Sequence, residues 1–381
     1  MTQTTENVNK KNLSFFVIAG EESGDTHGSK LIASMKKTYP NCRFVGHGGN
    51  KMEAQGVHII EHIDNLSMVG FSEVIKHLPY MKRVLTQTIK KITQINPIRI
   101  ILIDYPGFNL QLIKKISSLK IPITYFILPQ VWAWKESRVK ILRDFVDQSL
   151  SIFPFEPGWF RARGVSVRYV GHPFSEFSPP KVSRRAFFKK HNLDPKSPLL
   201  VLLPGSRQQE VDRHWNILLE TTKTLRSAIL NLNVIVGKAP SVTLSPNSEN
   251  IHTEYDSKAA LYFGSAAIIA SGTATLEAAV ANIPFIVCYR MSSFSWFLLQ
   301  RLSKVSYASI VNLIGKKEIV PEFLQNKMTP ENLSKALFPL INESTKRESM
   351  RNDFGQVIKT LGEPGVYDRL AKEILQKHTS C

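Results

Sequence analysis

Short apolar runs, each ended by a glycine or a polar turn, recur along this chain of 381 residues. Runs of about four to eight such residues, separated by longer amphipathic stretches, predict strands that alternate with helices. Near-continuous apolar runs are typical of parallel strands that are covered on both faces. The pattern therefore predicts an α/β protein. The expected strands are 13–20, 43–46, 99–104, 123–128, 148–153, 168–171, 199–203, 233–237, 251–253, 266–270 and 285–288.

Prolines interrupt the pattern over 173–180, and the alternation of strands and helices then starts again. Such a break favours a domain boundary. We expect a first domain over 1–175, a second over 176–355 and a helical tail over 356–381. The repeated pattern predicts two Rossmann-like domains facing across a cleft, with ligands at the carboxyl ends of the strands.

A small-residue turn, Ser271-Gly272-Thr273, follows one buried strand of the second half. Thr273 is a good N-cap type, and a helix is expected over 273–282. A strand, turn and helix in this order point backbone N–H groups and a positive helix end at one spot, which suits a phosphate or diphosphate. Glu277, one turn into the helix, could accept hydrogen bonds from ribose hydroxyls. An ordinary crossover without a ligand is the alternative.

A second turn of this kind, Pro204-Gly205-Ser206-Arg207, follows the strand over 199–203. The guanidinium of Arg207 could clamp a diphosphate, because its planar fork matches phosphate geometry. The second half therefore supplies candidate anion-binding groups.

Carboxylates end two strands of the first half. Glu21, Glu22 and Asp25 follow the first strand, ahead of a helix expected from about residue 26, and Asp104 ends the strand over 99–104. A carboxylate in this position is a candidate general base. The alternatives are solvated loop carboxylates for Glu21 and Glu22, capping for Asp25 and loop ordering or capping for Asp104. Anion-binding groups in one half and carboxylates in the other suit sugar transfer from a nucleotide-activated donor to an alcohol.

Residues 66–92 form a basic amphipathic pattern with helical spacing, which Pro79 is expected to kink. The default interpretation is a core-facing helix with a solvated basic face, and the alternative is a helix that rests on anionic lipid. The apolar and basic positions considered for membrane or acceptor contact are Phe71, Val74, Ile75, Leu78, Met81, Lys82 and Arg83.

Two tryptophans, Trp132 and Trp134, follow the strand over 123–128 without clear periodicity, and Lys135 and Arg138 come next. A sugar platform and a domain interface are both compatible with this aromatic loop.

Composition and charge narrow the class of protein. The hydrophobic content of 43% and charged content of 21% are those of a soluble globular protein, and 49 basic against 31 acidic residues give a net charge of +18. That excess favours nucleic acid, an anionic membrane surface or small anions as partners. No window of about 18 apolar residues spans a bilayer, and no signal-peptide order is present. Three cysteines without a CxxC pair favour a reducing, cytoplasmic location.

No metal or other cofactor is expected. The sequence holds no Asp-x-Asp pair, no HExxH motif and no Cys/His cluster. Helix N-termini and Arg207 would therefore offset the charge that develops on a leaving diphosphate.

Several motifs, in order and at these separations, resemble those of the lipid-A-disaccharide synthase family, which are glycosyltransferases of the GT-B architecture. The resemblance runs from about residue 15 to 324. The motifs are GEESGD (20–25), SMVGFSE (67–73), IDYPGFN (103–109), PQVWAW (129–134), FPFE (153–156), GHP (171–173), LPGSR (203–207) and SGTATLE (271–277).

The resemblance implies that UDP-2,3-diacylglucosamine is joined to the 6-hydroxyl of 2,3-diacylglucosamine 1-phosphate, with inversion and release of UDP. Asp104 and Arg207 fall where the family has its activity-critical aspartate and arginine, and many members carry a second aspartate where this chain has Gly107. The implied UDP-binding residues are Gly205, Ser206, Arg207, Ser271, Gly272, Thr273, Ala274 and Glu277.

A lipid acceptor agrees with the positive charge and the basic apolar helix. We therefore expect a peripheral protein on the cytoplasmic face of the inner membrane. The resemblance also implies a C-terminal segment that crosses to the first domain or to a partner chain, and a homodimer is considered as the oligomeric state. Nucleic acid is not expected, because the basic residues are dispersed and no aromatic-interleaved binding motif is present. A UDP-sugar 2-epimerase-like enzyme of the same architecture is the alternative.

Overall fold

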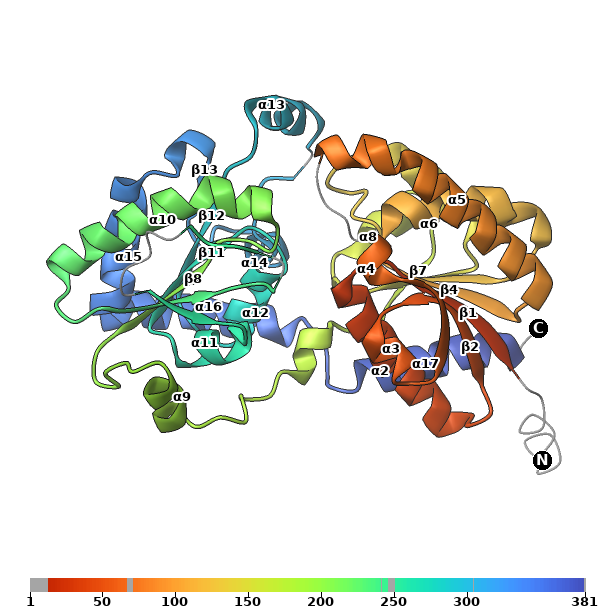
Figure 1. Cartoon of the computed structure of the whole chain (residues 1–381), viewed down its shortest axis with the longest axis horizontal. Helices are drawn as coiled ribbons and strands as arrows, with labels where there is room; N and C mark the ends of the chain where they lie inside the picture. Colours follow the sequence, from red (N-terminus) through yellow and green to blue (C-terminus); the bar gives the residue numbers. More distant parts are fainter. Residues whose placement is uncertain (1–12, 67–70, 241, 246–250, 304, 380–381) are drawn as a thin grey trace. The chain divides into compact units, whose positions relative to one another are not determined.

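The computed structural model describes residues 13–66, 71–240, 242–245, 251–303 and 305–379, without the side chains of 71–77, 294, 298 and 377–379. The chain divides into two compact units (Figure 1). The first consists of Met1–Pro173 and Gly362–Cys381, and the second of Phe174–Leu361. Each unit is built on its own parallel sheet. The predicted α/β class with two Rossmann-like halves is confirmed.

The described residues of the first unit form a seven-stranded sheet in the order β3-β2-β1-β4-β5-β6-β7. The order reverses between β1 and β4, which makes the carboxyl ends of these two strands the topological switch point where ligands bind in open α/β sheets. The strands are β1 (Ser14–Ala19), β2 (Arg43–Gly48), β3 (Val57–His62), β4 (Arg99–Ile103), β5 (Ile123–Phe126), β6 (Gln148–Ser151) and β7 (Val167–Tyr169).

Helices cover both faces of this sheet (Figure 1). On one face the last helix of the chain packs beside the first, α17 against α2, while α5 and α6 pack together on the other. The α-helices of the first unit are α2 (Glu22–Thr38), α3 (Asn50–Glu53), α4 (Ile63–Leu66), α5 (Phe71–Ile95), α6 (Pro106–Ile116), α7 (Val139–Phe145), α8 (Glu156–Arg161) and α17 (Val366–Thr379).

The second unit has a six-stranded parallel sheet in the order β10-β9-β8-β11-β12-β13, with its switch point between β8 and β11. Its strands are β8 (Leu199–Leu203), β9 (Asn233–Gly237), β10 (His252–Glu254), β11 (Ala266–Ala270), β12 (Phe285–Tyr289) and β13 (Glu322–Leu324). Its α-helices are α9 (Arg184–Lys190), α10 (Gln208–Ala228), α11 (Ser257–Phe263), α12 (Ala274–Val280), α13 (Ser293–Leu302), α14 (Ile310–Gly315), α15 (Pro330–Asn342) and α16 (Ser344–Lys359).

Several element boundaries differ from the prediction. Helix α2 begins at Glu22 rather than near Thr26, because Glu21 takes the extended N-cap conformation. Two carboxylates then fall in the first helical turn, where the helix dipole favours negative charge. Helix α12 ends at Val280, earlier than predicted, and α5 runs as one helix through Pro79. Strands β3 and β13, which the pattern does not predict, lie at sheet edges.

Candidate functional site

The switch point of the first unit brings together the loops after β1 and β4. The two strands are parallel neighbours with Ala19 opposite Ile103, so the residues that follow each of them lie at the same edge of the sheet. Gly20 is required there, because a Cβ at this position would lie 2.2 Å from the ring of Tyr105. The two sequence-predicted segments are therefore in direct contact.

Asp104 lies at the end of β4 in a constrained backbone conformation. It and Tyr105 both have positive φ, 48° and 51°, which is uncommon for non-glycine residues and typical of functional sites. The carbonyl oxygen of Asp104 accepts hydrogen bonds from the hydroxyl of Tyr125 (2.8 Å) and from Nδ2 of Asn109 (2.6 Å). These bonds hold the residue at the strand end.

The pKa of the Asp104 carboxyl is raised to about 6, mainly by burial and in part by the negative charge of Glu21, while the N–H of Tyr105 opposes the rise. Glu21 therefore lies close enough to Asp104 for their charges to interact. At neutral pH such a carboxyl is mostly ionised and is a stronger base than an exposed aspartate.

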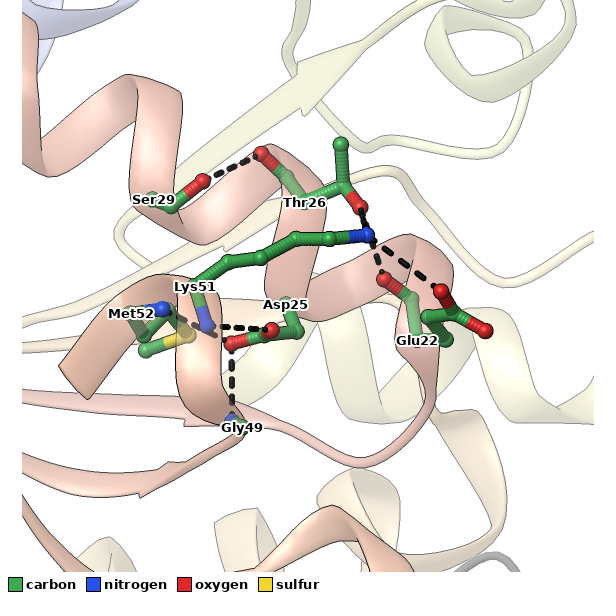
Figure 2. Close-up of polar contacts among 7 residues, drawn as sticks. All are labelled: Glu22, Asp25, Thr26, Ser29, Gly49, Lys51 and Met52. Carbon is green, nitrogen blue, oxygen red and sulfur yellow. Dashed lines mark hydrogen bonds and ion pairs between the residues drawn. The ribbon is translucent and has the colours of Figure 1, made fainter. Parts of the chain in front are cut away.

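Asp25 has a different environment, which Figure 2 shows. Its buried carboxylate accepts hydrogen bonds from the backbone N–H groups of Gly49 (2.7 Å), Met52 (3.0 Å) and Lys51 (3.0 Å) at the start of α3. Asp25 thus ties α2 to the turn after β2. Asp25 lies inside α2, so the expectation that it caps this helix is wrong. Its oxygens are directed at three donors at the start of α3, which indicates a structural role.

Glu22 is exposed on the same helix. Lys51 reaches back across α2, where its ammonium lies 3.3 Å from Glu22 and donates to the hydroxyl of Thr26 (2.8 Å) (Figure 2). Glu21 is also exposed and makes no side-chain capping bond. Of the four predicted carboxylates, Asp104 and Glu21 lie together, whereas Glu22 and Asp25 contact the residues around α3.

Glu156, in the FPFE motif, is a further carboxyl of this unit for which the sequence alone predicts no role. Glu156 is 1% exposed and accepts hydrogen bonds from Nε1 of Trp132 (3.0 Å) and the N–H of Phe153 (3.4 Å). Its pKa is raised to about 8, mainly by burial, which outweighs these two hydrogen bonds, and in small part by the charge of Asp104. Its sequence signal is an acidic residue within the aromatic and proline run FPFEP.

In the second unit, β8 and β11 pair in parallel with Leu203 opposite Ile269, so the two predicted turns meet at the switch point. Gly205 has a φ of 130°, and a Cβ there would lie 2.7 Å from the carboxylate of Glu210. Arg207 occupies the N-cap of α10 with its side chain exposed, and Nη1 lies 3.5 Å from Oε1 of Glu210. The free guanidinium end is accessible to a diphosphate.

Three buried or half-buried side chains support these turns, and none of them was singled out from the sequence. The N–H of Ser206 and the hydroxyl of Tyr289 donate to Glu210, at 3.3 and 3.0 Å. His214 Nδ1 donates to the carbonyl of Pro204 (2.7 Å), and its Nε2 accepts from the N–H of Arg290 (2.9 Å). Burial lowers the pKa of His214, which keeps the ring in the neutral form that this pair of bonds requires.

The Ser271-Gly272-Thr273 turn is exposed at its centre. The hydroxyl of Ser271 donates to the carbonyl of Ala308 (2.8 Å). Thr273 occupies the N-cap of α12, but its side chain makes no capping bond, so the capping prediction is wrong for it. The hydroxyl of Thr275 instead donates to the carbonyl of Gly272 (2.8 Å).

Ala274 opens helix α12 and Glu277 lies in its first turn. Glu277 is half-buried, and burial, with the charge of Asp256, raises its pKa while Lys258 opposes the rise. Its carboxyl is therefore at the same edge of the sheet as the turn that precedes the helix.

The side chains of Phe71, Val74 and Ile75 lie outside the described residues, as does the backbone of 67–70. The rest of α5 buries Val84 and Ile92. The remaining positions that the sequence considered for membrane contact lie on its surface or partly so: Leu78 is 50% exposed, Met81 is half-buried, and Lys82 and Arg83 are exposed.

The described helices include none that is long and apolar enough to cross a membrane. In the same residues, no three side chains of the His, Cys, Asp and Glu types are grouped so as to hold a metal ion.

The chain is similar to proteins of known family over almost its whole length. The family model for lipid-A-disaccharide synthetase matches residues 15–377. The lipid-A-disaccharide synthase of Myxococcus xanthus is 34% identical over 372 residues, which cover 94% of this chain and 96% of the relative. That of Coxiella burnetii is 32% identical over 371 residues, which cover 95% and 98%.

Solved structures with the same fold are more distant in sequence. A UDP-GlcNAc 2-epimerase of Methanocaldococcus jannaschii, in complex with UDP-GlcNAc and UDP, superposes with a TM-score of 0.61 at 13% identity, covering 96% of this chain and 99% of that chain. The calicheamicin glycosyltransferase CalG4 superposes with a TM-score of 0.59 at 13% identity, covering 97% and 99%. The architecture is therefore the GT-B type that both classes of enzyme share.

Proposed function

This chain belongs to the lipid-A-disaccharide synthase family, and from that membership we propose that it transfers 2,3-diacylglucosamine from its UDP derivative to the 6-hydroxyl of 2,3-diacylglucosamine 1-phosphate. The products are the β-1,6-linked disaccharide 1-phosphate and UDP, with inversion at the anomeric carbon. One observation supports this assignment beyond the family match. In each unit, the residues selected from the sequence follow the two strands that flank the switch point.

The second unit binds the UDP moiety in this proposal. Arg207 provides an exposed guanidinium for the diphosphate, and the N–H groups of the two turns provide further donors. Charge-assisted hydrogen bonds are about twice as strong as neutral ones, so Arg207 contributes the largest single interaction with the leaving group. Glu277 accepts from the ribose hydroxyls.

The first unit supplies the base. Asp104 takes the proton of the acceptor 6-hydroxyl as its oxygen attacks the anomeric carbon, and burial, assisted by the charge of Glu21, keeps the pKa of Asp104 high enough for that transfer. A positioned general base contributes a factor of about 10²–10⁴ to the rate. Asp25, whose carboxylate is occupied by three N–H donors, has no part in this step.

Product analysis tests the assignment. Purified protein is incubated with UDP-2,3-diacylglucosamine and the 1-phosphate acceptor in detergent micelles, and disaccharide and UDP are measured together. We expect one UDP for each disaccharide formed. The assignment fails if the wild-type protein releases UDP without forming the disaccharide.

A UDP-sugar 2-epimerase has the same architecture but no need of an acceptor. That activity would consume the UDP-sugar in the absence of acceptor lipid and form an isomer without free UDP. We expect no isomer, because the family match over 15–377 is to the synthase.

We also propose that helix α5 rests on an anionic membrane surface, on the cytoplasmic face of the inner membrane. Exposed Leu78 lies beside the cations Lys82 and Arg83, in a chain with a net charge of +18. An apolar contact flanked by basic residues is the usual arrangement of a helix that lies in a membrane interface.

Co-sedimentation with vesicles that contain anionic lipid tests this contact. Leu78→Ser should lower the bound fraction, while Leu230→Ser should not. Leu230 is a suitable control because it is 85% exposed and lies in the second unit. Equal binding by both variants would argue against α5 as the contact.

A further inference from the structure

The loop after β5 displays an exposed tryptophan beside a buried one. Trp132 packs edge-on against Phe155, with ring centroids 5.0 Å apart, and donates its N–H to Glu156 (3.0 Å). Trp134, two residues later, is 45% exposed. A large aromatic ring on a loop that is anchored in this way is held in place for contact with a ligand.

Two cations lie on the exposed indole. Nζ of Lys135 is 4.5 Å from the ring centroid of Trp134, and Cζ of Arg138 is 5.7 Å from it. In the described parts of the chain, neither cation forms an ion pair with a carboxylate. Glu136, the acidic residue between them in sequence, is bound by Arg163 at 2.6 Å. The surface formed by Trp134, Lys135 and Arg138 therefore carries two positive charges that no carboxylate of the described residues pairs with.

The backbone of this loop is constrained. Ile127 and Lys135 have φ values of 59° and 56°, in the left-handed region that β-branched and bulky residues rarely adopt. The N–H of Arg138 donates to the carbonyl of Lys135 (3.0 Å), which starts a short 3₁₀ turn. Strained backbone conformations of this kind cluster at active sites and ligand-binding sites.

The loop lies close to the proposed base. Strands β4 and β5 are parallel neighbours, so Asp104 and this loop follow adjacent strand ends. The guanidinium of Arg138 lowers the pKa of Tyr125, against the larger effect of burial, and the hydroxyl of Tyr125 donates to the carbonyl of Asp104 (2.8 Å). The loop that carries Trp134 therefore starts beside Asp104.

We propose that Trp134, Lys135 and Arg138 form the acceptor subsite, in which the indole stacks on a pyranose ring and the two cations bind its phosphate monoester. The apolar C–H face of a pyranose fits an exposed aromatic ring. An ammonium and a guanidinium suit a dianionic phosphate. This inference rests on the proposed function, since it concerns the acceptor of that reaction.

The test compares two acceptors in detergent micelles, 2,3-diacylglucosamine 1-phosphate and the same lipid without the phosphate. For Lys135→Gln with Arg138→Gln, we expect the KM of the phosphorylated acceptor to rise about 10- to 100-fold, because two charge-assisted contacts are lost. The KM of the unphosphorylated acceptor and of the UDP-sugar should stay within about twofold. Trp134→Ala should raise the KM of both acceptors about equally.

Lys114→Gln with Lys140→Gln is the control, since it removes the same charge from exposed positions on α6 and α7. The control should keep the wild-type preference for the phosphorylated acceptor. An unchanged preference in the Lys135/Arg138 variant would overturn the proposal. If the wild type forms no disaccharide at all, the proposed function fails instead, and the two failures are thereby distinguished.

A lipid headgroup carries the same phosphate chemistry, so vesicle binding is measured on the same variants. The subsite predicts that the Lys135/Arg138 variant binds anionic vesicles as the wild type does. Loss of vesicle binding, with an equal fall in turnover for both acceptors, would assign these cations to the membrane and overturn the proposal.

Discussion

Among single residues, Asp104, as the proposed base, leads to the most direct prediction about activity. Its carboxyl must be ionised to accept a proton, and burial with the charge of Glu21 raises its pKa to about 6. We expect kcat/KM to fall about tenfold for each pH unit below that value, since only the ionised fraction reacts. Initial rates between pH 4.5 and 8 measure this profile.

Asp104→Asn should lower kcat by about 10²–10⁴ and leave a profile without the acid limb. UDP affinity, measured by calorimetry, is the control and should not change, because the proposed UDP-binding residues lie in the second unit. Near-normal turnover in this variant would remove Asp104 from the role of base.

Glu156 leads to a prediction about stability. Its pKa is about 8 in the folded protein against 4.5 for the free side chain, because the carboxyl is buried. Between these values the folded state holds a proton that the unfolded state releases. Stability from this group is therefore fully present below about pH 4.5 and is lost as the pH rises towards 8, by about 1.4 kcal/mol per pH unit.

The comparison variant is Glu156→Gln, which keeps an acceptor for Trp132 but cannot ionise. Both proteins are unfolded by calorimetry across pH 4.5–8.5. We expect the free energy of unfolding of the variant to increase relative to that of the wild type as the pH rises. A difference that stays constant with pH would show that Glu156 is ionised in the folded protein.

Among elements, the link between α2 and α3 depends on one carboxylate. Asp25→Ala leaves the three N–H groups of Gly49, Lys51 and Met52 without their acceptor in a buried position. We expect the free energy of unfolding of the first unit to fall by about 3 kcal/mol, in the range for removing one partner of a buried charged group. Urea unfolding measures the change.

Glu22→Gln is the matched control on the same helix, since Glu22 is exposed and its ion pair with Lys51 spans 3.3 Å. Such surface pairs contribute about 0–1 kcal/mol. If Asp25→Ala were as stable as this control yet inactive, Asp25 would have a catalytic role rather than the structural one that its contacts indicate.

On the scale of the whole molecule, the chain returns to its first unit at the end. Helix α17 buries its apolar face there, and the hydroxyl of Tyr367 lies 2.8 Å from Nδ1 of His27 on α2. Arg369 donates to the carbonyl of Val170 (3.0 Å), and Asp368 accepts from Ser34. Helix α17 is therefore part of the fold of the first unit, in which it packs on α2.

A chain that ends at Leu361 should retain the second unit and lose the first. The buried side chains of α17 are Val366, Tyr367, Leu370, Ala371, Ile374 and Leu375. Each large apolar side chain contributes about 1.5–3 kcal/mol, so together they approach the whole stability of a domain, about 5–15 kcal/mol. Calorimetry should show one of the two unfolding transitions disappear.

Tyr367→Phe is the milder control, which keeps the buried ring and removes the hydroxyl that lies 2.8 Å from His27. It should cost about 1 kcal/mol and keep both transitions. Two normal transitions in the truncated chain would contradict the role given to α17. The expected homodimer stays a prediction, which light scattering of the full chain tests.

The sequence alone was sufficient for the fold class and the family. Central strands are buried on both faces and so must be continuously apolar, which is why β8, β9 and β11 have the predicted bounds. Edge strands have no such requirement, so β3, with the sequence VHIIEH, and the three-residue β13 left no clear pattern. The family could also be recognised from the sequence alone, because the order and spacing of the motifs along the chain can be read without the three-dimensional structure.

Only the tertiary structure decided which carboxylates belong together. Glu21, Glu22 and Asp25 are almost adjacent in sequence, yet Glu21 interacts with Asp104, whereas Asp25 binds the start of α3. The pKa of Glu156 also depends on the tertiary structure, because it is raised mainly by burial among side chains that the fold brings around it. Strand propensity depends on residues that are close along the chain, so it can be predicted from the sequence. A pKa or a hydrogen-bond partner depends on residues distant along the chain, and therefore on the fold itself.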